Sequence, residues 1–332
     1  MVERYLFLII FYYNFVKQTS AVLPTFFNYI ILFYERVETM KKPIFTGSGV
    51  AIITPFTNDG TDYNKLSELI EYQIKEGTDA IIICGTTGEA STMYDDEHKA
   101  AIKFTVEKVN GRIPVIAGTG SNHTVHAVAL SKYAEEVGAD AILTVTPYYN
   151  KTSQKGLYEH FKMVAESIKI PVVLYNVPSR TNLNIAPETI QALSKIDNIV
   201  ALKECNLSQI GDVINLCGDD ITVYSGEDGA IVPFLSMGAK GVISVLANIA
   251  PKDTHDIVAK YLSGDIEGSR KLQLKALDLI KALFCEVSPM PIKAAMNLMG
   301  MNIGGCRLPL VEMSEKNLEI LKTELVKYGL LA

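Results

Sequence analysis

From residue 47 onward, apolar runs of about four to eight residues recur with a spacing of about 25–35 residues. The runs are apolar at every position rather than at alternate positions, which is typical of strands buried on both faces of a parallel sheet. They occupy residues 49–56, 80–84, 114–118, 141–146, 171–175, 199–202, 221–224 and 241–246.

Segments with helical periodicity lie between these runs. Residues 62–75 place Leu66, Leu69, Ile70 and Ile74 on one face, and residues 95–109 and 124–137 are similar. Eight such β-plus-α units predict an α/β fold, a closed (β/α)₈ TIM barrel. The alternative is a doubly wound open sheet, which would need a GxGxxG turn after its first strand. Here the glycines of residues 47–49 precede that strand.

Three further helical segments follow the eighth unit, at residues 266–285, 291–299 and 314–327. A barrel does not need them, so we expect a C-terminal three-helix appendage that covers the barrel or makes subunit contacts. The predicted organisation is therefore a barrel at residues 44–264 and a C-terminal helical region at residues 265–332.

Residues 1–39 differ from the rest of the chain, since they hold eleven of the 28 aromatic residues and none of the 23 glycines. Their apolar runs, 6–16 and 21–34, are shorter than the roughly 18–20 residues that span a bilayer. The segment could be a membrane-surface anchor, a packed extension, or a stretch upstream of the true start codon that is not part of the native protein. We favour the last interpretation, with the native protein starting at Met40.

Composition narrows the class of protein. A net charge of −6 provides no basic surface for nucleic acid. Five cysteines, an odd number spread over 332 residues, do not form the pattern of a disulfide framework. These features favour a reduced cytoplasmic protein that binds neither nucleic acid nor a membrane.

Because the active sites of barrels lie at the carboxyl ends of the strands, the residues there are the candidates for chemistry. Lys203 follows the apolar run Ile199–Leu202, where burial would lower the pKa of its amine and allow attack on a carbonyl. Tyr175 ends the preceding strand and could carry protons beside it. The alternative for Lys203 is an ion pair with Glu204 or another carboxylate.

Two more strand ends suggest binding of anions. The turn 85–88, Gly-Thr-Thr-Gly, offers backbone N–H groups and two hydroxyls to a carboxylate or phosphate. Arg180 follows a proline turn and could bind a carboxylate, or it could be a solvated arginine. His123 and His126 have metal-ligand spacing without an evident third ligand, so we predict no metal site.

In this order, several sequence blocks resemble the dihydrodipicolinate synthase (4-hydroxy-tetrahydrodipicolinate synthase) family of pyruvate-dependent class I aldolases. The resemblance covers residues 44–330. The blocks are GVAIITPF at 49–56, GTTGE at 85–89, VIAGTG at 115–120, PYYNK at 147–151, YNVPSRT at 175–181, KE at 203–204, GVISVLAN at 241–248, and residues 289–293 and 307–309.

This resemblance implies a lyase that captures pyruvate as a Schiff base on Lys203, without a metal or organic cofactor. It also implies that the resulting enamine attacks L-aspartate 4-semialdehyde, the first committed step toward diaminopimelate and lysine. Thr86, Tyr175 and Tyr149 match the family's proton relay, in which Tyr149 enters the site of a neighbouring subunit. A homotetramer, a dimer of dimers, is implied in the same way.

The resemblance also implies which residues bind the substrates. Thr87, with Thr86, matches the pair that holds the pyruvate carboxylate. Arg180 matches the residue that binds the carboxylate of the semialdehyde. Gly226 and Ile243 match positions of main-chain contacts near pyruvate.

Two departures from the family pattern stand out. The loop after Glu204 lacks two residues that the family usually has. At the regulatory lysine pocket, His98 and Asn122 match, with Tyr148 nearby, whereas Asp95 and His126 do not match. We therefore expect weak or absent feedback by lysine.

Related aldolases remain as alternatives. N-acetylneuraminate lyases and 2-keto-3-deoxy sugar-acid aldolases share the lysine and tyrosine, but they would need hydroxyl-binding groups where this chain has Tyr148, Tyr149 and Arg180. A membrane-tethered barrel without enzymatic activity is a further alternative, suggested by residues 1–39. A buried amine argues against it, because a scaffold has no use for one.

Overall fold

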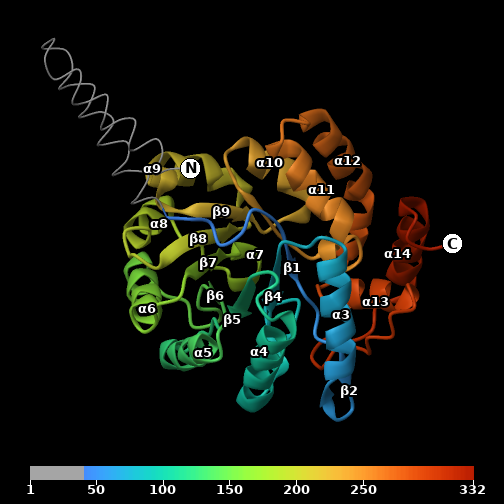
Figure 1. Cartoon of the computed structure of the whole chain (residues 1–332), viewed down its shortest axis with the longest axis horizontal. Coiled ribbons are helices and arrows are strands. Elements are labelled where there is room, and N and C mark those ends of the chain that lie inside the picture. The colour runs from blue at the N-terminus through green and yellow to red at the C-terminus, as the bar shows by residue number, and fades with distance from the viewer. Residues whose placement is uncertain (1–40) are drawn as a thin grey trace, which may run out of the picture. The chain divides into compact units, whose positions relative to one another are not determined.

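The structure, a computed structural model, describes residues 41–332, and in this range eight parallel strands close into a barrel (Figure 1). Their order around the barrel is β1-β10-β9-β8-β7-β6-β5-β4. The predicted (β/α)₈ fold is confirmed. The segment 1–39 lies outside the described residues. The barrel strands are β1 Gly47–Ala51, β4 Ala80–Ile83, β5 Val115–Gly118, β6 Ala141–Val145, β7 Val172–Asn176, β8 Ile199–Glu204, β9 Thr222–Ser225 and β10 Gly241–Ser244.

Helices follow the strands and surround the barrel (Figure 1). Those between strands or directly after β10 are α3 Tyr63–Lys75, α4 Asp95–Val109, α5 Thr124–Glu136, α6 Gln154–Glu166, α7 Pro178–Thr181, α8 Pro187–Leu193, α9 Ile210–Cys217, α10 Ile231–Ser236 and α11 Pro251–Leu262. The last three are α12 Ile266–Leu283, α13 Met290–Leu298 and α14 Glu315–Tyr328, of which α14 packs on α12 and α13. The division of the chain near residue 264 stays a prediction.

The first strand is shorter than the apolar run that predicted it. Instead of residues 49–56, the strand is Gly47–Ala51, because the following polar groups bond outside the barrel ladder. The Ile53 N–H donates to Asn248 Oδ1 (3.1 Å), and the Thr54 hydroxyl donates to the Gly88 carbonyl (2.7 Å). Pro55 has no N–H to offer a ladder. A small hairpin of β2 Phe56–Thr57 and β3 Gly60–Thr61 follows.

Side chains alternate between the barrel interior and the helices, as the pleat of a strand requires. On β8, Ala201 lies in the cluster that fills the barrel, while Leu202 packs in the cluster under the helices. Lys203 is therefore directed inward and Glu204 outward. This register determines which of the two charged residues can meet a substrate.

The segment before β1 packs across the inside of the barrel. The Phe45 ring stacks on Tyr224 with 4.3 Å between centroids, and the Tyr224 hydroxyl donates to the Phe45 carbonyl (2.7 Å). In residues 41–332, no helix is both long and apolar enough to cross a membrane.

Candidate active site

Lys203 and Tyr175 lie side by side at the carboxyl ends of β8 and β7. They are partners in the register of the two strands, and Lys203 Nζ lies 4.4 Å from the centroid of the Tyr175 ring. Each residue is 6% exposed. Burial lowers the pKa of the Lys203 amine, an effect that Cys205 and Asp228 oppose. The amine is thus more readily neutral, and nucleophilic, than that of a solvated lysine.

Glu204 is not the partner of Lys203, so the alternative of an ion pair between them is wrong. The Glu204 carboxylate is fully buried on the other side of β8, where it accepts from Asn176 Nδ2 (2.8 Å), Gln209 Nε2 (2.8 Å) and the Asn206 N–H (2.7 Å). Burial raises the pKa of Glu204 to about 7 against the opposing effect of these donors. The shortened loop after β8 is thereby tied to the strand.

Tyr175 is held as a neutral phenol. Burial raises its pKa above the usual range, while Arg180 and a hydrogen bond with the Thr86 side chain act in the opposite direction. A protonated phenol that shares a hydrogen bond with a hydroxyl can donate a proton on one side and take one back on the other.

The turn after β4 presents Thr86 toward Tyr175. The Gly88 N–H donates to the Gly85 carbonyl (3.1 Å) and the Glu89 N–H to the Thr86 carbonyl (3.1 Å), which closes a tight turn. Thr86 is exposed, whereas Thr87 is buried. The turn therefore offers one hydroxyl to the open side and holds the other against the protein.

A cavity of about 560 Å³ lies over these groups. Thr86, Tyr175 and Arg180 are all on its wall, together with Tyr148. Lys203 reaches this region through its contact with the Tyr175 ring. The volume is within the range of small-molecule sites, about 300–1,000 Å³.

Arg180 comes from α7, the short helix that follows β7. Pro178 is at the start of that helix, where its missing N–H has no intrahelical acceptor in any case. The Arg180 side chain is exposed and donates from Nη2 to the Ser288 carbonyl (3.2 Å). Arg180 also lines the cavity, where a carboxylate could bind it.

Gly226 lies against Lys203, and Ile243 lies in the barrel interior. A Cβ atom on Gly226 would lie 2.3 Å from Cys205 Sγ and 3.2 Å from Lys203 Cε, so only glycine fits. Ile243, 1% exposed, belongs to the cluster inside the barrel that also contains Tyr175.

Tyr149 does not line the cavity of its own chain. It is 94% exposed, and its backbone has the left-handed φ of 68° that non-glycine residues rarely adopt. Its expected place in the site of a neighbouring subunit therefore stays a prediction.

The expected regulatory residues line the same cavity. His98 donates from Nε2 to the Gly118 carbonyl (2.8 Å), and Asn122 donates to the Tyr148 carbonyl (3.1 Å). His126 Nε2 lies 2.9 Å from Asp95 Oδ1. The two positions that depart from the family pattern are therefore bonded to each other.

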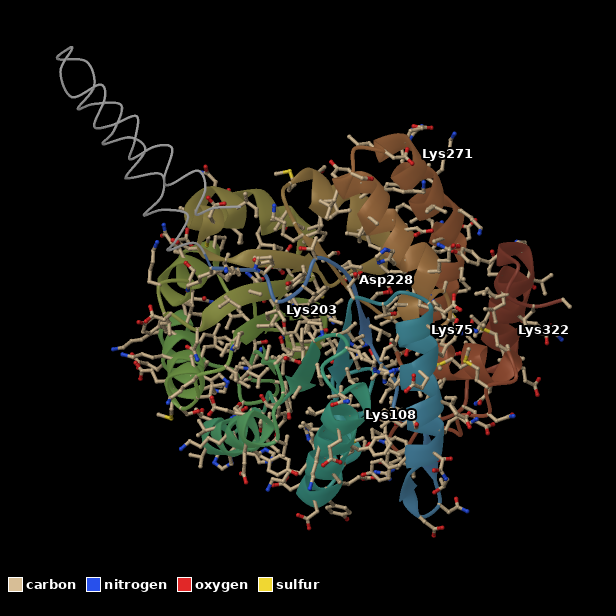
Figure 2. The ribbon with its side chains drawn as sticks, in the orientation of Figure 1. Lys75, Lys108, Lys203, Asp228, Lys271 and Lys322 are labelled. Atoms are coloured by element: carbon tan, nitrogen blue, oxygen red, sulfur yellow. The ribbon has the colours of Figure 1, made fainter. Side chains whose placement is uncertain are left out.

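Sequence reasoning missed Asp228. Its carboxylate is 2% exposed and accepts from the N–H groups of Val245 (3.0 Å) and Leu246 (2.9 Å), and its charge favours the ammonium form of Lys203. Figure 2 shows Lys203 and Asp228 in the middle of the molecule, and Lys75, Lys271 and Lys322 on outer helices. An acidic residue two positions after Gly226 was the available signal.

Among residues 41–332, no group of three histidine, cysteine or acidic side chains could hold a metal ion. The chemistry that the described groups themselves offer is that of an amine, a phenol and a hydroxyl.

Comparison with known proteins gives a consistent result. The model of the dihydrodipicolinate synthetase family matches residues 44–327. A 4-hydroxy-tetrahydrodipicolinate synthase of Acetivibrio thermocellus is 71% identical over 292 residues, which cover 88% of this chain and all of that protein.

Solved structures agree. The dihydrodipicolinate synthase of Aquifex aeolicus is 46% identical with a TM-score of 0.84, covering 86% of this chain and 99% of that one. A structure described as a monomeric dihydrodipicolinate synthase variant is 44% identical with a TM-score of 0.85, covering 87% and 98%.

Proposed function

This chain belongs to the dihydrodipicolinate synthetase family, and from that premise we propose that it condenses pyruvate with L-aspartate 4-semialdehyde through a Schiff base on Lys203. The observation that carries the proposal is the buried amine of Lys203 beside Tyr175, under a cavity whose wall holds Thr86. A class I aldolase needs this combination of a neutral amine and a proton carrier.

The first half of the reaction makes an enamine. The neutral amine of Lys203 attacks C2 of pyruvate, a C–N bond forms, and the carbonyl oxygen leaves as water. The resulting imine is protonated and draws electrons from C3, so one methyl proton departs. Tyr175 and Thr86, whose side chains interact, are placed to carry these protons.

The second half makes the carbon–carbon bond. C3 of the enamine attacks the aldehyde carbon of the semialdehyde, whose oxygen takes a proton. The amine of that substrate then attacks the imine carbon, closes a six-membered ring and displaces Lys203. The product is 4-hydroxy-tetrahydrodipicolinate, and the lysine is regenerated.

Binding groups hold the two carboxylates that the reaction brings together. The turn with Thr86 and Thr87 would take the pyruvate carboxylate, and Arg180 would take that of the semialdehyde. Gly226 and Ile243 would offer main-chain contacts near pyruvate. Holding both substrates in the attacking geometry removes much of the entropic barrier.

We further propose that Tyr149 completes the proton relay in a neighbouring subunit of a cytoplasmic homotetramer, built as a dimer of dimers. Its exposure and its left-handed backbone support this, because an exposed tyrosine held in a rare conformation is otherwise unexplained.

Lysine feedback is expected to be weak. Asp95 and His126 bond to each other at the cavity, so a lysine would have to displace that contact. We expect the rate of condensation to stay near its normal value in about 10 mM lysine, a concentration at which weak ligands bind.

The proposed activity is tested by incubating the protein with pyruvate, reducing with borohydride and locating the adduct by mass spectrometry. We expect a pyruvate-derived adduct on Lys203 and none in the Lys203→Met variant. Turnover is then compared between L-aspartate 4-semialdehyde, with pyruvate, and N-acetylneuraminate. Absence of the adduct would end the proposal, and faster turnover of N-acetylneuraminate would favour the sugar-acid enzymes instead.

A further inference from the structure

Glu89 ends the turn that carries Thr86 and Thr87, and its side chain is turned away from the cavity into the protein. The side chain is 1% exposed, and the backbone has a left-handed φ of 54°. Its N–H donates to the Thr86 carbonyl (3.1 Å). The backbone of Glu89 is therefore bonded directly to that of Thr86.

Two groups from the C-terminal part of the chain hold the Glu89 carboxylate. Lys293 of α13, whose side chain is 2% exposed, places Nζ 2.5 Å from Oε1 and also donates to the Gly305 carbonyl (2.9 Å). The backbone N–H of Arg307 donates to Oε2 (2.9 Å). Both oxygens of the carboxylate are thus bound by groups more than 200 residues away in sequence.

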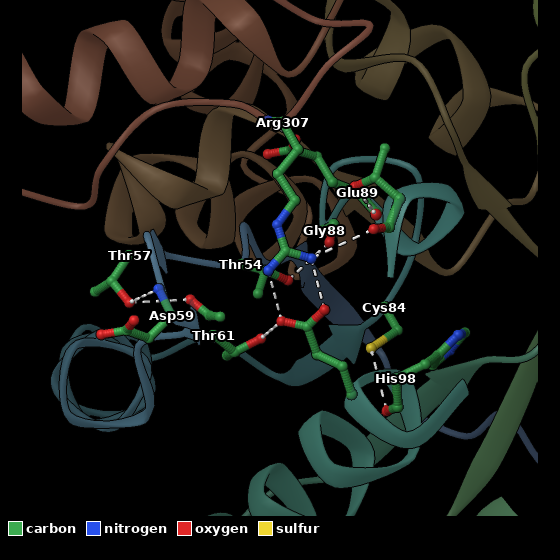
Figure 3. A network of polar contacts seen from close by, with 12 residues as sticks. Thr54, Thr57, Asp59, Thr61, Cys84, Gly88, Glu89, His98 and Arg307 are labelled. Carbon is green, nitrogen blue, oxygen red and sulfur yellow. Dashed lines mark hydrogen bonds and ion pairs between the residues drawn. The ribbon is translucent and has the colours of Figure 1, made fainter. Parts of the chain in front are cut away.

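The segment that carries Arg307 is itself fixed to the barrel. The Arg307 guanidinium pairs with both oxygens of Glu97 on α4 (2.5 and 2.7 Å) and lies 3.8 Å from the centroid of the Phe56 ring. Lys293 Nζ lies 4.4 Å from the centroid of that ring. Figure 3 shows Arg307 between Glu89 and the β2–β3 region, with Gly88 beside Glu89.

We infer that Glu89 is a positioning residue, which Lys293 and the Arg307 backbone hold so that the turn presents Thr86 to pyruvate. A buried ion pair adds little net stability compared with apolar side chains, so this pair calls for another explanation. Fixing one geometry of a strained turn is such an explanation. The inference rests on the proposed function and adds to it a role for the C-terminal segment.

The test measures the pyruvate concentration that gives half-maximal borohydride trapping on Lys203. In Glu89→Gln we expect this concentration to rise about tenfold, since small misplacements of binding groups have effects of this size or larger. In Glu89→Gln/Lys293→Met no charge is left buried and unpaired, so the melting temperature should recover while the pyruvate defect persists. Recovery of both the melting temperature and pyruvate binding would show that Glu89 has a merely structural role.

A double-mutant cycle with Thr86→Val makes the assignment specific. If Glu89 acts through the turn, Thr86→Val should raise the half-maximal pyruvate concentration much less in the Glu89→Gln background than in the wild type. If the two substitutions instead raise the half-maximal pyruvate concentration by independent factors that multiply, the inference is overturned.

Asp79→Asn is the matched control. The Asp79 carboxylate lies before β4, at the opposite end of that strand, and binds the Ser48 N–H (2.7 Å) and His255 Nδ1 (2.8 Å). The Asp79→Asn substitution should reduce stability and leave pyruvate binding unchanged. If wild-type protein gives no adduct, the proposed function fails. If wild type and Glu89→Gln trap pyruvate equally well, the positioning role alone fails.

Discussion

At the scale of single residues, the strand register turns one charged side chain into a nucleophile. Lys203 shares the inward face of β8 with Ala201, and there the amine has lost most of its water. Its neighbour Glu204, one position further, is directed outward into a shell of amide donors. A shift of one residue in this strand would exchange the two and direct the Lys203 amine out of the barrel interior.

The buried amine predicts a specific pH dependence. Only the neutral form attacks pyruvate, so the rate of adduct formation should rise with pH and level off below about 10.4, the pKa of a solvated lysine. In Asp228→Asn the levelling should occur at a still lower pH, because a negative charge that favours the ammonium form is removed. Single-turnover trapping at several pH values between about 6 and 10 measures the levelling pH in the wild type and in the variant. A shift upward in the variant would contradict the assignment.

Gly226→Ala should abolish most of the activity. The added Cβ would clash with Cys205 Sγ at 2.3 Å and press on Lys203 Cε at 3.2 Å. We expect kcat/KM to fall by about 100-fold or more, because the lysine is displaced from its attacking position. Steady-state kinetics measure this loss.

The double variant Gly226→Ala/Cys205→Ala provides the control for that clash. Truncating Cys205 removes the sulfur that the new methyl group meets, so part of the activity should return. A double variant as slow as the single one would show that the Lys203 contact dominates.

Single residues differed in how well the sequence predicted them. Lys203 stood out because a lysine after an apolar run is costly to bury, and Tyr175 followed from its place at the end of the preceding strand. The anchors of Glu89 gave no local signal, since Lys293 and Arg307 meet it only through the tertiary fold. Their sequence blocks could be matched to a family without revealing this contact.

At the scale of elements, the eight apolar runs predicted all eight barrel strands, because strands covered on both faces are largely apolar. Ends were less predictable. The apolar character continues through Ile52 and Ile53 after β1 has ended, since both side chains pack in the core while the Ile53 N–H bonds Asn248 instead of a strand. The short helix α7 was not predicted, because four residues are too few for a periodic pattern.

The contact between α5 and α6 predicts a loss of stability in acid. The Nδ1 atom of His160 on α6 shares a hydrogen bond with the Thr124 hydroxyl (2.9 Å), and its buried Nε2 has no partner within residues 41–332. Burial lowers the pKa of His160 to about 4. As the pH falls, His160 therefore binds a proton in the unfolded chain before it does so in the folded one. Stability from the neutral ring is complete above about pH 6.5 and decreases by about 3 kcal/mol as the pH falls to about 4.

Urea unfolding at several pH values measures this dependence. In His160→Asn, whose amide can still meet Thr124, the free energy of unfolding should change less between pH 6.5 and 4, roughly the window given by the two pKa values. An equal slope in both proteins would show that other groups control the acid response.

At the scale of the whole molecule, the proposed exchange of Tyr149 between subunits predicts complementation. Lys203→Met and Tyr149→Phe should each be nearly inactive alone. After subunits are mixed and exchanged, half of the dimers contain one of each, and one of their two sites regains both residues. About a quarter of the wild-type activity should therefore return, by counting over a two-fold pair. Activity assays on mixed and unmixed variants, with sedimentation to establish the assembly, make the measurement, and no recovery would contradict a shared site.

The seam where β1 meets β10 also bears on how the protein is made. Gly47 pairs with Gly241, so the first strand is synthesised 194 residues before the partner that closes the barrel. At about 5–20 residues per second, a ribosome needs roughly 10–40 s to cover that length. During this interval one edge of β1 lacks its partner strand, and its unpaired N–H and C=O groups stay open to pairing with another chain until Gly241 is made.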